Sequence, residues 1–248
     1  MLLAQISDLH LDGDALANER ATRAVDYLRS MTRQPDAVLV TGDIADHGAP
    51  AEYAEAADLL ARIDAPVFTC PGNHDERTAY RKVLLGEENP TAAAINHLHH
   101  AAGYALLLLD SSIPGEDPGL LDDETLDWLT RTLDDLGDTP ALPVFHHPPT
   151  TLHHPYIDSI GLTNADRLAE VLAGRPNIPA VLTGHAHTPA AATFAGRPLL
   201  VAPGVTSTIR LPWEPGDHFA SRTAPPGIAF HVLGEDGSDT ITTHFRTV

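Results

Sequence analysis

The stretch Asp-Ala-Val-Leu-Val-Thr-Gly-Asp at residues 36–43 decides the fold class of this chain. Its apolar middle is typical of a short buried strand, and the Gly-Asp pair that follows is typical of a turn. The same pattern opens the chain at Leu2 to Ser7 and returns at Pro66 to Cys70, which Pro-Gly follows. Amphipathic helices are predicted between these strands, at Ala17 to Met31 and Ala51 to Ile63. Strands and helices in alternation predict a mostly parallel sheet with helices on its faces.

The second half of the chain continues the alternation less regularly. Further strands, two helices and an antiparallel end are predicted there: strands Tyr104 to Leu109, Ala141 to Phe145 and Ile178 to Thr183, helices Asp122 to Leu136 and Asn164 to Leu172, and closing strands Gly227 to Leu233 and Thr240 to Phe245. The segment Pro203 to Pro226 is rich in Pro and Gly, so we expect a long loop that serves as a lid or a dimer contact. Because no repeat or linker interrupts the sequence, residues 1–248 are expected to form a single domain.

The composition restricts the classes of partner. The 248 residues carry 34 acidic and 15 basic side chains, which gives a formal net charge of −19. We therefore expect neither a nucleic-acid polymer nor a membrane surface as partner, since both are bound mainly through Lys and Arg. The single cysteine, Cys70, permits no internal disulfide and suits a reducing compartment. No apolar run approaches the roughly 20 residues of a membrane span, and the first residues lack the basic flank of a signal peptide, so a cytoplasmic location is expected.

Polar residues with metal-binding side chains follow the predicted strands. They stand directly after strand ends, and they are Asp8, His10, Asp43, Asn73, His74, His146, His185 and His187. Because ligands bind at the carboxyl ends of the strands in open α/β sheets, we expect these side chains to converge on one crevice. Asp8 and His10 are two positions apart, and so are His185 and His187. The two side chains of each pair are expected to point to one side, as alternate residues of an extended chain do.

The chemistry of this donor set suits transition metals. Carboxylate oxygen, amide oxygen and neutral imidazole bind first-row cations such as Zn, Mn, Fe, Co or Ni. Apart from His74, the set offers two Asp, one Asn and four His. These seven ligands are too many for one tetrahedral ion, whereas one shared carboxylate makes two sites of about four ligands each. This composition predicts a two-metal hydrolytic centre, with ions about 3.5–4 Å apart that clamp an in-line displacement.

Five motifs in this order are similar to those of a known family. They are Asp8-x-His10, Gly42-Asp43, Gly72-Asn73-His74-Asp75, His146 and Gly184-His185-x-His187. On these motifs the chain resembles the calcineurin-like metallophosphoesterases, and among them the bacterial class III cyclic nucleotide phosphodiesterases and glycerophosphodiesterases. The resemblance spans residues 1 to about 203. It implies an α/β fold, namely a four-layer αββα sandwich of two mixed sheets flanked by helices.

The resemblance also implies a role for each motif residue. Asp8, His10 and His187 would hold one ion, and Asn73, His146 and His185 would hold the other. Asp43 would bridge the two ions, which could be iron, manganese, zinc or cobalt. His74 would act catalytically near the leaving-group oxygen. A metal-bridging hydroxide would hydrolyse a small phosphodiester, either a cyclic nucleotide or a glycerophosphodiester, and a homodimer is compatible with the resemblance.

Substrate contacts are expected from the motifs and from two loops. We expect them at Asn73, His74, His153, His154 and Trp213. The histidine pair lies in the predicted loop 148–161, and the tryptophan is suited to stack on a base as part of a lid. Asp46 and Asp75 are expected to cap helices or to orient the imidazoles of ligand histidines.

The sequence also bears on alternative functions. The net charge argues against a nuclease, and Asp46 stands where a purple acid phosphatase would carry Tyr. A phosphomonoesterase or phosphoprotein phosphatase stays open, because Arg77 and Arg81 follow the Asn-His motif and could grip a phosphomonoester. A non-catalytic metal-binding scaffold is the remaining alternative, although such relatives usually lose ligands and none is missing from this sequence.

Overall fold

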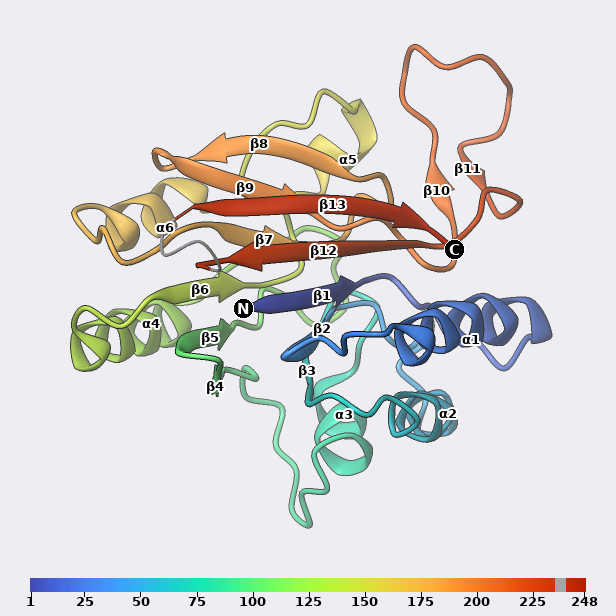
Figure 1. Ribbon diagram of the computed structural model, residues 1–248, viewed down its shortest axis with the longest axis horizontal. Coiled ribbons are helices and arrows are strands. Elements are labelled where there is room, and N and C mark those ends of the chain that lie inside the picture. The colour runs from blue at the N-terminus through green and yellow to red at the C-terminus, as the bar shows by residue number, and fades with distance from the viewer. Residues whose placement is uncertain (235–239) are drawn as a thin grey trace.

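The computed structural model describes residues 1–234 and 240–248, which fold into two stacked mixed sheets with helices outside them (Figure 1). The first sheet has the strand order β13 (Ile241–Thr247), β12 (Gly227–Leu233), β1 (Leu2–Ile6), β2 (Ala37–Thr41) and β3 (Val67–Cys70). Strands β1, β2 and β3 are parallel, whereas β12 runs antiparallel to both of its neighbours. The predicted parallel sheet with an antiparallel end is therefore confirmed.

The second sheet is built from the middle of the chain. Its strand order is β4 (His97–Ala101), β5 (Tyr104–Leu108), β6 (Ala141–Val144), β7 (Val181–Thr183), β9 (Arg197–Val201) and β8 (Ala190–Phe194). The four central strands are parallel and the two edge strands are antiparallel to them. Both sheets thus have parallel strands at their centre, which brings several carboxyl ends to one edge of each sheet.

Three apolar clusters define the layers. Helices α1 (Ala15–Ser30) and α2 (Pro50–Leu60) pack on the outer face of the first sheet, and α3 (Arg77–Val83) adds Tyr80 to this cluster. Helices α4 (Asp123–Leu136) and α6 (Ala165–Leu172) pack on the outer face of the second sheet. Between the sheets, Leu3 and Leu39 of the first pack with Leu106 and Leu182 of the second. Each fully buried leucine contributes about 1.5–3 kcal/mol, so the order helix, sheet, sheet, helix follows from the apolar pattern.

The helices follow the predicted spacing. The buried residues of α1 recur three or four positions apart, at Ala17, Ala21, Ala24 and Leu28, which places one stripe against the sheet. Helix α2 begins with Pro50, whose fixed φ favours the first helical position. Within the described residues, no helix is long and apolar enough to cross a membrane.

Two segments expected to be loops contain regular structure. Segment Pro203 to Pro226 includes a small antiparallel sheet of β10 (Thr208–Ile209) and β11 (Ala220–Ser221), which projects from the body in Figure 1. The predicted loop 148–161 includes the short helix α5 (Pro155–Ser159), which starts with Pro155 and with a cap from His154. Elements of two and five residues are too short to give a periodic apolar signal, so their sequences read as loops.

One polar network crosses the apolar layer between the sheets. Gln5 of β1 donates from Nε2 to Oγ1 of Thr41 at 2.9 Å and to the carbonyl oxygen of Thr183 at 3.0 Å. Oε1 of Gln5 accepts from Nε2 of His231 at 2.9 Å, and Nδ1 of His231 pairs with Oγ1 of Thr243 at 2.8 Å. Burial lowers the pKa of His231 to about 3, so this ring is neutral near pH 7.

Candidate metal centre

The predicted ligand residues meet where the parallel strands of both sheets end. Asp8 and His10 follow β1, Asp43 follows β2, Asn73 follows β3, His146 follows β6, and His185 and His187 follow β7. Most of them line one pocket. Among the described residues, Asp8, His10, Asp43 and His187 form one group that could hold an ion, and His146 and His185 form another with His147. The strand-end positions therefore converge as expected, and residues from both sheets take part.

The backbone at these residues is left-handed rather than extended. The φ angles are 57° at Asp8, 43° at His10, 49° at Asp43, 68° at His185 and 53° at His187. The expectation of extended pairs is therefore wrong, because the chain turns sharply after each strand and the turn aims the side chains. A non-glycine residue in this region costs about 1–3 kcal/mol, and such strain is concentrated at functional sites.

Two glycines let the ligand turns approach one another closely. Gly42 has a φ of 91°, and a Cβ there would overlap the imidazole of His146. A Cβ at Gly72 would overlap the carboxylate of Asp43. Glycine is required at both positions for close packing, and at Gly42 also for its backbone conformation.

The first group consists of Asp8, His10, Asp43 and His187. Nε2 of His10 lies 3.4 Å from Oδ2 of Asp43 and 3.2 Å from Nε2 of His187. Nε2 of His187 in turn lies 3.5 Å from Oδ1 of Asp8. Four atoms that can donate electron pairs therefore surround one small space.

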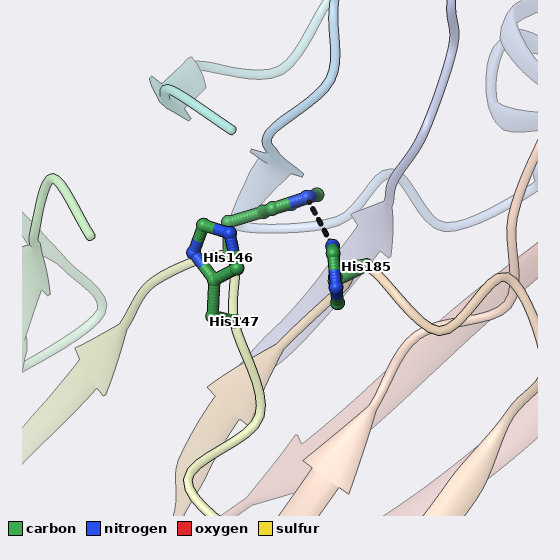
Figure 2. A group of neighbouring side chains, drawn as sticks. All are labelled: His146, His147 and His185. Carbon is green, nitrogen blue, oxygen red and sulfur yellow. Dashed lines mark hydrogen bonds between the residues drawn. The ribbon is translucent and has the colours of Figure 1, made fainter. Parts of the chain in front are cut away.

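The second group is centred on His146 and His185. Nε2 of His146 lies 3.2 Å from Oδ2 of Asp43, the same oxygen that faces His10 in the first group. Nδ1 of His185 lies 3.1 Å from Nε2 of His146, and Figure 2 shows these two rings turned toward each other. The Asp43 carboxylate thus lies between the two groups, where a ligand shared by two ions would stand.

The outward ring nitrogens are held by the surrounding structure. Nδ1–H of His10 donates to Oδ1 of Asp46 at 2.7 Å, and Nδ1–H of His146 donates to the carbonyl oxygen of Thr41 at 2.7 Å. Nδ1 of His187 pairs with the Ser207 hydroxyl at 2.9 Å. Such outer hydrogen bonds fix the tautomer of a ligand histidine and raise its basicity. They leave Nε2 of His10 and of His146 as lone pairs that face inward.

Several buried polar atoms of the predicted ligand residues have no hydrogen-bond partner among the described residues. The buried atoms without such a partner include both carboxylate oxygens of Asp8, Oδ1 of Asn73 and Nε2 of His185. Burying such atoms without a partner costs free energy, and a carboxylate costs the most. Cations would satisfy them. The 3.2 Å between Nε2 of His10 and of His187 is also close to the about 3.4 Å that separates two nitrogen ligands of tetrahedral zinc.

The electrostatics of the centre are dominated by Asp43. Burial by itself raises the pKa of the Asp43 carboxyl, but the imidazoles of His146, His10 and His74 more than offset this and hold that pKa well below its ordinary value. For His146, burial lowers the pKa of the imidazole, but the nearby Asp43 carboxylate raises it by more, so the pKa is about 9. A metal ion must displace a proton from such a ring, so binding is accompanied by proton release.

Asp75 connects the turns that carry the ligands. Its Oδ2 accepts from the backbone N–H of Gly72 at 2.9 Å and of Ile44 at 3.2 Å, and its Oδ1 accepts from the N–H of Ala45 at 3.1 Å. The Tyr53 hydroxyl also donates to Oδ1, at 3.0 Å. Asp75 therefore braces two backbone turns, and its hydrogen-bond partners among the described residues include no imidazole. Asp46 instead accepts from His10, as expected for an outer carboxylate.

Comparison with known proteins agrees with this geometry. The profile of the calcineurin-like phosphoesterase family matches residues 1–189. The chain belongs to this family. A probable cyclic nucleotide phosphodiesterase of Rhodococcus erythropolis is 35% identical over 243 residues, which cover 94% of this chain and 80% of that protein. A glycerophosphodiester phosphodiesterase of Enterobacter lignolyticus is 34% identical over 197 residues, which cover 75% of this chain and 71% of that protein.

Solved structures show the same architecture. A dimetal phosphatase from Danio rerio superposes with a TM-score of 0.73 at 16% identity, covering 100% of this chain and 96% of the other. At this identity the likeness concerns the fold alone, and it confirms the four-layer sandwich. Family membership makes this protein a metal-dependent phosphoesterase, and the two groups of ligand atoms supply places for the ions.

His147 of the phosphoesterase lies beside the centre but is engaged elsewhere. Its ring is near those of His146 and His185, as Figure 2 shows. Nδ1 pairs with the Ser111 hydroxyl at 2.8 Å, and Nε2–H donates to the carbonyl oxygen of Asp117 at 3.1 Å. Burial, together with the nearby His146, lowers the pKa of His147 to about 3. Both nitrogens of this neutral ring are therefore used to hold the 111–117 loop.

His74 lines the pocket without joining the two groups at Asp43. Its backbone N–H donates to Oδ1 of Asp43 at 3.0 Å, and its Nδ1–H donates to the carbonyl oxygen of Asp46 at 2.8 Å. The ring packs edge-on against His10, with centroids 4.5 Å apart, and His74 is part-exposed. A rigid, accessible imidazole beside the candidate ions is suited to exchange a proton with a substrate.

The pocket itself has a volume of about 170 Å³ and contains residues that the sequence did not indicate. Tyr156, Phe219 and Ser207 line it with the ligand residues. The three loop residues expected to contact substrate lie elsewhere: His153 and Trp213 are exposed outside this lining, and His154 is buried behind α5. Tyr156 and Phe219 are brought together by elements far apart in the sequence, so no local pattern could have identified them.

Proposed function

We propose that this phosphoesterase hydrolyses small phosphodiesters at a binuclear centre held by the two groups of ligands. The single observation that carries the proposal is the convergence of unpaired ligand atoms from both sheets on one small pocket. The similarity to relatives named as cyclic nucleotide and glycerophosphodiester phosphodiesterases supports the choice of a diester.

Each ion would have its own ligands and share one. Asp8, His10 and His187 would hold the first ion, Asn73, His146 and His185 the second, and Asp43 both. Iron, manganese, zinc and cobalt suit these oxygen and nitrogen donors. Two such ions supply Lewis-acid charge for the phosphate and a water activated for attack at neutral pH.

The charge around the pocket favours a diester over a monoester. A monoester carries nearly two negative charges at pH 7 and a diester carries one. Among the described residues that line the pocket there is no Lys or Arg. Arg77 is bound to Asp110 at 2.8 Å and to the carbonyl oxygen of Ser112 at 2.9 Å, and Arg81 is bound to Glu87 at 2.7 Å. These arginines therefore stabilise the α3 region, and a doubly charged phosphate would have only the ions to offset its charge.

The size of the pocket and the position of His74 complete the proposal. Sites for drug-sized ligands typically occupy about 300–1,000 Å³, so a pocket of about 170 Å³ suits a small ester. With Nδ1–H donating to Asp46, the opposite nitrogen Nε2 of His74 is the one that would pass a proton to the leaving oxygen.

The test is a substrate panel on metal-reconstituted enzyme. It compares an aryl diester, the matching aryl monoester, a cyclic nucleotide and a glycerophosphodiester, with metal content measured on each preparation. We expect kcat/KM to be higher for the diester than for the monoester. Asp43→Asn should lose metal and activity together, whereas the exposed Asp64→Asn should keep both. A preference for the monoester would overturn the diesterase assignment, and two tightly held ions in Asp43→Asn would overturn the bridging role.

A further inference from the structure

Two aromatic side chains line the candidate pocket together with the polar residues of the ligand groups. Tyr156 of α5 and Phe219, next to β11, line the same pocket as Asn73 and His74. Both aromatic residues are exposed, Tyr156 to 47% and Phe219 to 49%. Their ring centroids lie 5.0 Å apart and their planes meet at 87°, an edge-to-face arrangement. Apolar rings that stay exposed beside a reaction centre are typical of a ligand-binding surface.

Contacts within the protein hold this pair in place. The carbonyl oxygen of Phe219 accepts the N–H of Arg210 at 3.0 Å within the β10–β11 sheet. The Phe219 ring also packs edge-on against His154, with centroids 5.7 Å apart. Nδ1 of His154 accepts the N–H of Ile157 in α5, and its Nε2–H donates to the carbonyl oxygen of Arg210 at 3.1 Å. His154 therefore fixes the helix that carries Tyr156 against the small sheet beside Phe219.

The base of the same segment is anchored from α1. The guanidinium of Arg20, which is only 4% exposed, donates to the carbonyl oxygen of Val205 at 2.9 Å. It also donates to the carbonyl oxygens of Arg222 and of Ala224, each at 2.7 Å. One buried side chain thus ties together both ends of the segment that carries Phe219. A surface arranged in advance loses little conformational entropy when it binds a ligand.

We infer that Tyr156 and Phe219 form an aromatic platform that binds the base of a nucleotide diester and makes the site favour nucleotides over aliphatic diesters. The inference rests on the proposed function, since it concerns the organic group of the ester at that same centre. A base can lie on the face of one ring and meet the edge of the other. Loss of such stacking weakens binding about 5- to 150-fold per base, whereas a glycerol group has no π face and gains nothing.

Trp213 is the rival for this role within the same segment. It is 69% exposed and is absent from the described residues that line the pocket. The platform and a tryptophan lid therefore predict different results, because Phe219 and Tyr156 line the pocket and Trp213 is not among the described residues that do.

The test measures binding and turnover separately on the metal-loaded protein. Calorimetry gives the Kd of adenosine monophosphate and of glycerol 3-phosphate for the wild type, Phe219→Ala, Tyr156→Ala, Tyr156→Phe and Trp213→Ala. Phe245→Ala, an exposed phenylalanine on β13, is the matched control. We expect Phe219→Ala and Tyr156→Ala to weaken the nucleotide about 5- to 150-fold and the glycerol phosphate less than about twofold. Tyr156→Phe, which keeps the ring, should bind the nucleotide as the wild type does.

Each outcome decides one of the two proposals. Equal losses for both ligands, no loss, or a selective loss in Trp213→Ala alone would overturn the platform. Wild-type protein that binds neither ligand would overturn it as well. Kinetics with cyclic adenosine monophosphate and glycerophosphoethanolamine then test the reaction. A selective nucleotide loss in Phe219→Ala from a protein that hydrolyses neither diester would support the platform and overturn the proposed function.

Discussion

The buried His231 makes the stability of this protein depend on pH in a way that one substitution removes. Its folded pKa is about 3, against 6.5 for an ordinary histidine, because burial disfavours the charged ring. Between pH 6.5 and about pH 3 the unfolded chain therefore binds a proton at His231 and the folded chain does not. The free energy of unfolding falls as the pH falls through this range. At pH 4.5 the loss reaches about 2.7 kcal/mol, whereas at pH 7.5 it is close to zero.

His231→Gln removes this titration and keeps a polar side chain beside Gln5 and Thr243. At pH 7.5 the variant should be less stable than the wild type by about 1–2 kcal/mol, because glutamine fits the site less well. The stability difference between wild type and variant should then shift by about 2.7 kcal/mol in favour of the variant on going to pH 4.5. Urea unfolding at the two pH values, at one metal concentration, measures both quantities.

His244→Gln is the matched control, since His244 is exposed on the neighbouring strand β13. Its stability difference from the wild type should stay within about 0.5 kcal/mol at both pH values. Metal binding also depends on pH, but it does so equally in all three proteins and cancels from the comparison. A pH-independent difference for His231→Gln would refute the conclusion that this ring is kept neutral by burial.

Three further outcomes test the metal centre and its support. Asp46→Ala removes the partner of His10 and should weaken metal binding about 10- to 100-fold in a titration against a fluorescent chelator; unchanged affinity would contradict the orienting role. His74→Ala should keep its ions and lose about 10²–10⁴ in kcat, with a smaller loss for diesters that have good leaving groups, so a uniform loss would argue against proton donation. Gly42→Ala forces a Cβ against His146 at a left-handed φ and should destabilise the fold by about 2–4 kcal/mol; an unaltered Tm would show that the turn can relax.

The fold and the convergence of the motif residues could be predicted from the sequence because both depend on local patterns. The apolar runs before Asp8 and Asp43 are long enough to mark strands, and the position of a ligand directly after a strand fixes its place at a sheet edge. Asp8 and His10 nevertheless do not form the extended pair that their spacing predicts. Left-handed backbone at non-glycine residues is imposed by the packing of neighbouring turns, which leaves no mark in the residues themselves.

The rest of the site depends on contacts between distant segments. The rings of Tyr156 and Phe219 meet only because α5 and the β10–β11 sheet dock on each other, and both elements are too short to show periodicity. The partners of Asp75 are backbone N–H groups, which any residue supplies, so composition could not separate its role from that of Asp46. The charge of the Arg77 side chain also could not show from the sequence that it forms a salt bridge with Asp110.

The two-sheet origin of the ligands has a consequence for when the protein becomes active during its synthesis. His10 and His187 face each other across 177 positions of sequence, and in the proposed assignment each ion would take ligands from both sheets. A chain that has emerged from the ribosome only as far as His146, just after β6, has the first five proposed ligand residues but lacks His185 and His187. Neither ion site is complete until β7 has formed and its turn has docked against β1. A nascent chain that ends before His185 would therefore have neither of the two proposed ion sites complete.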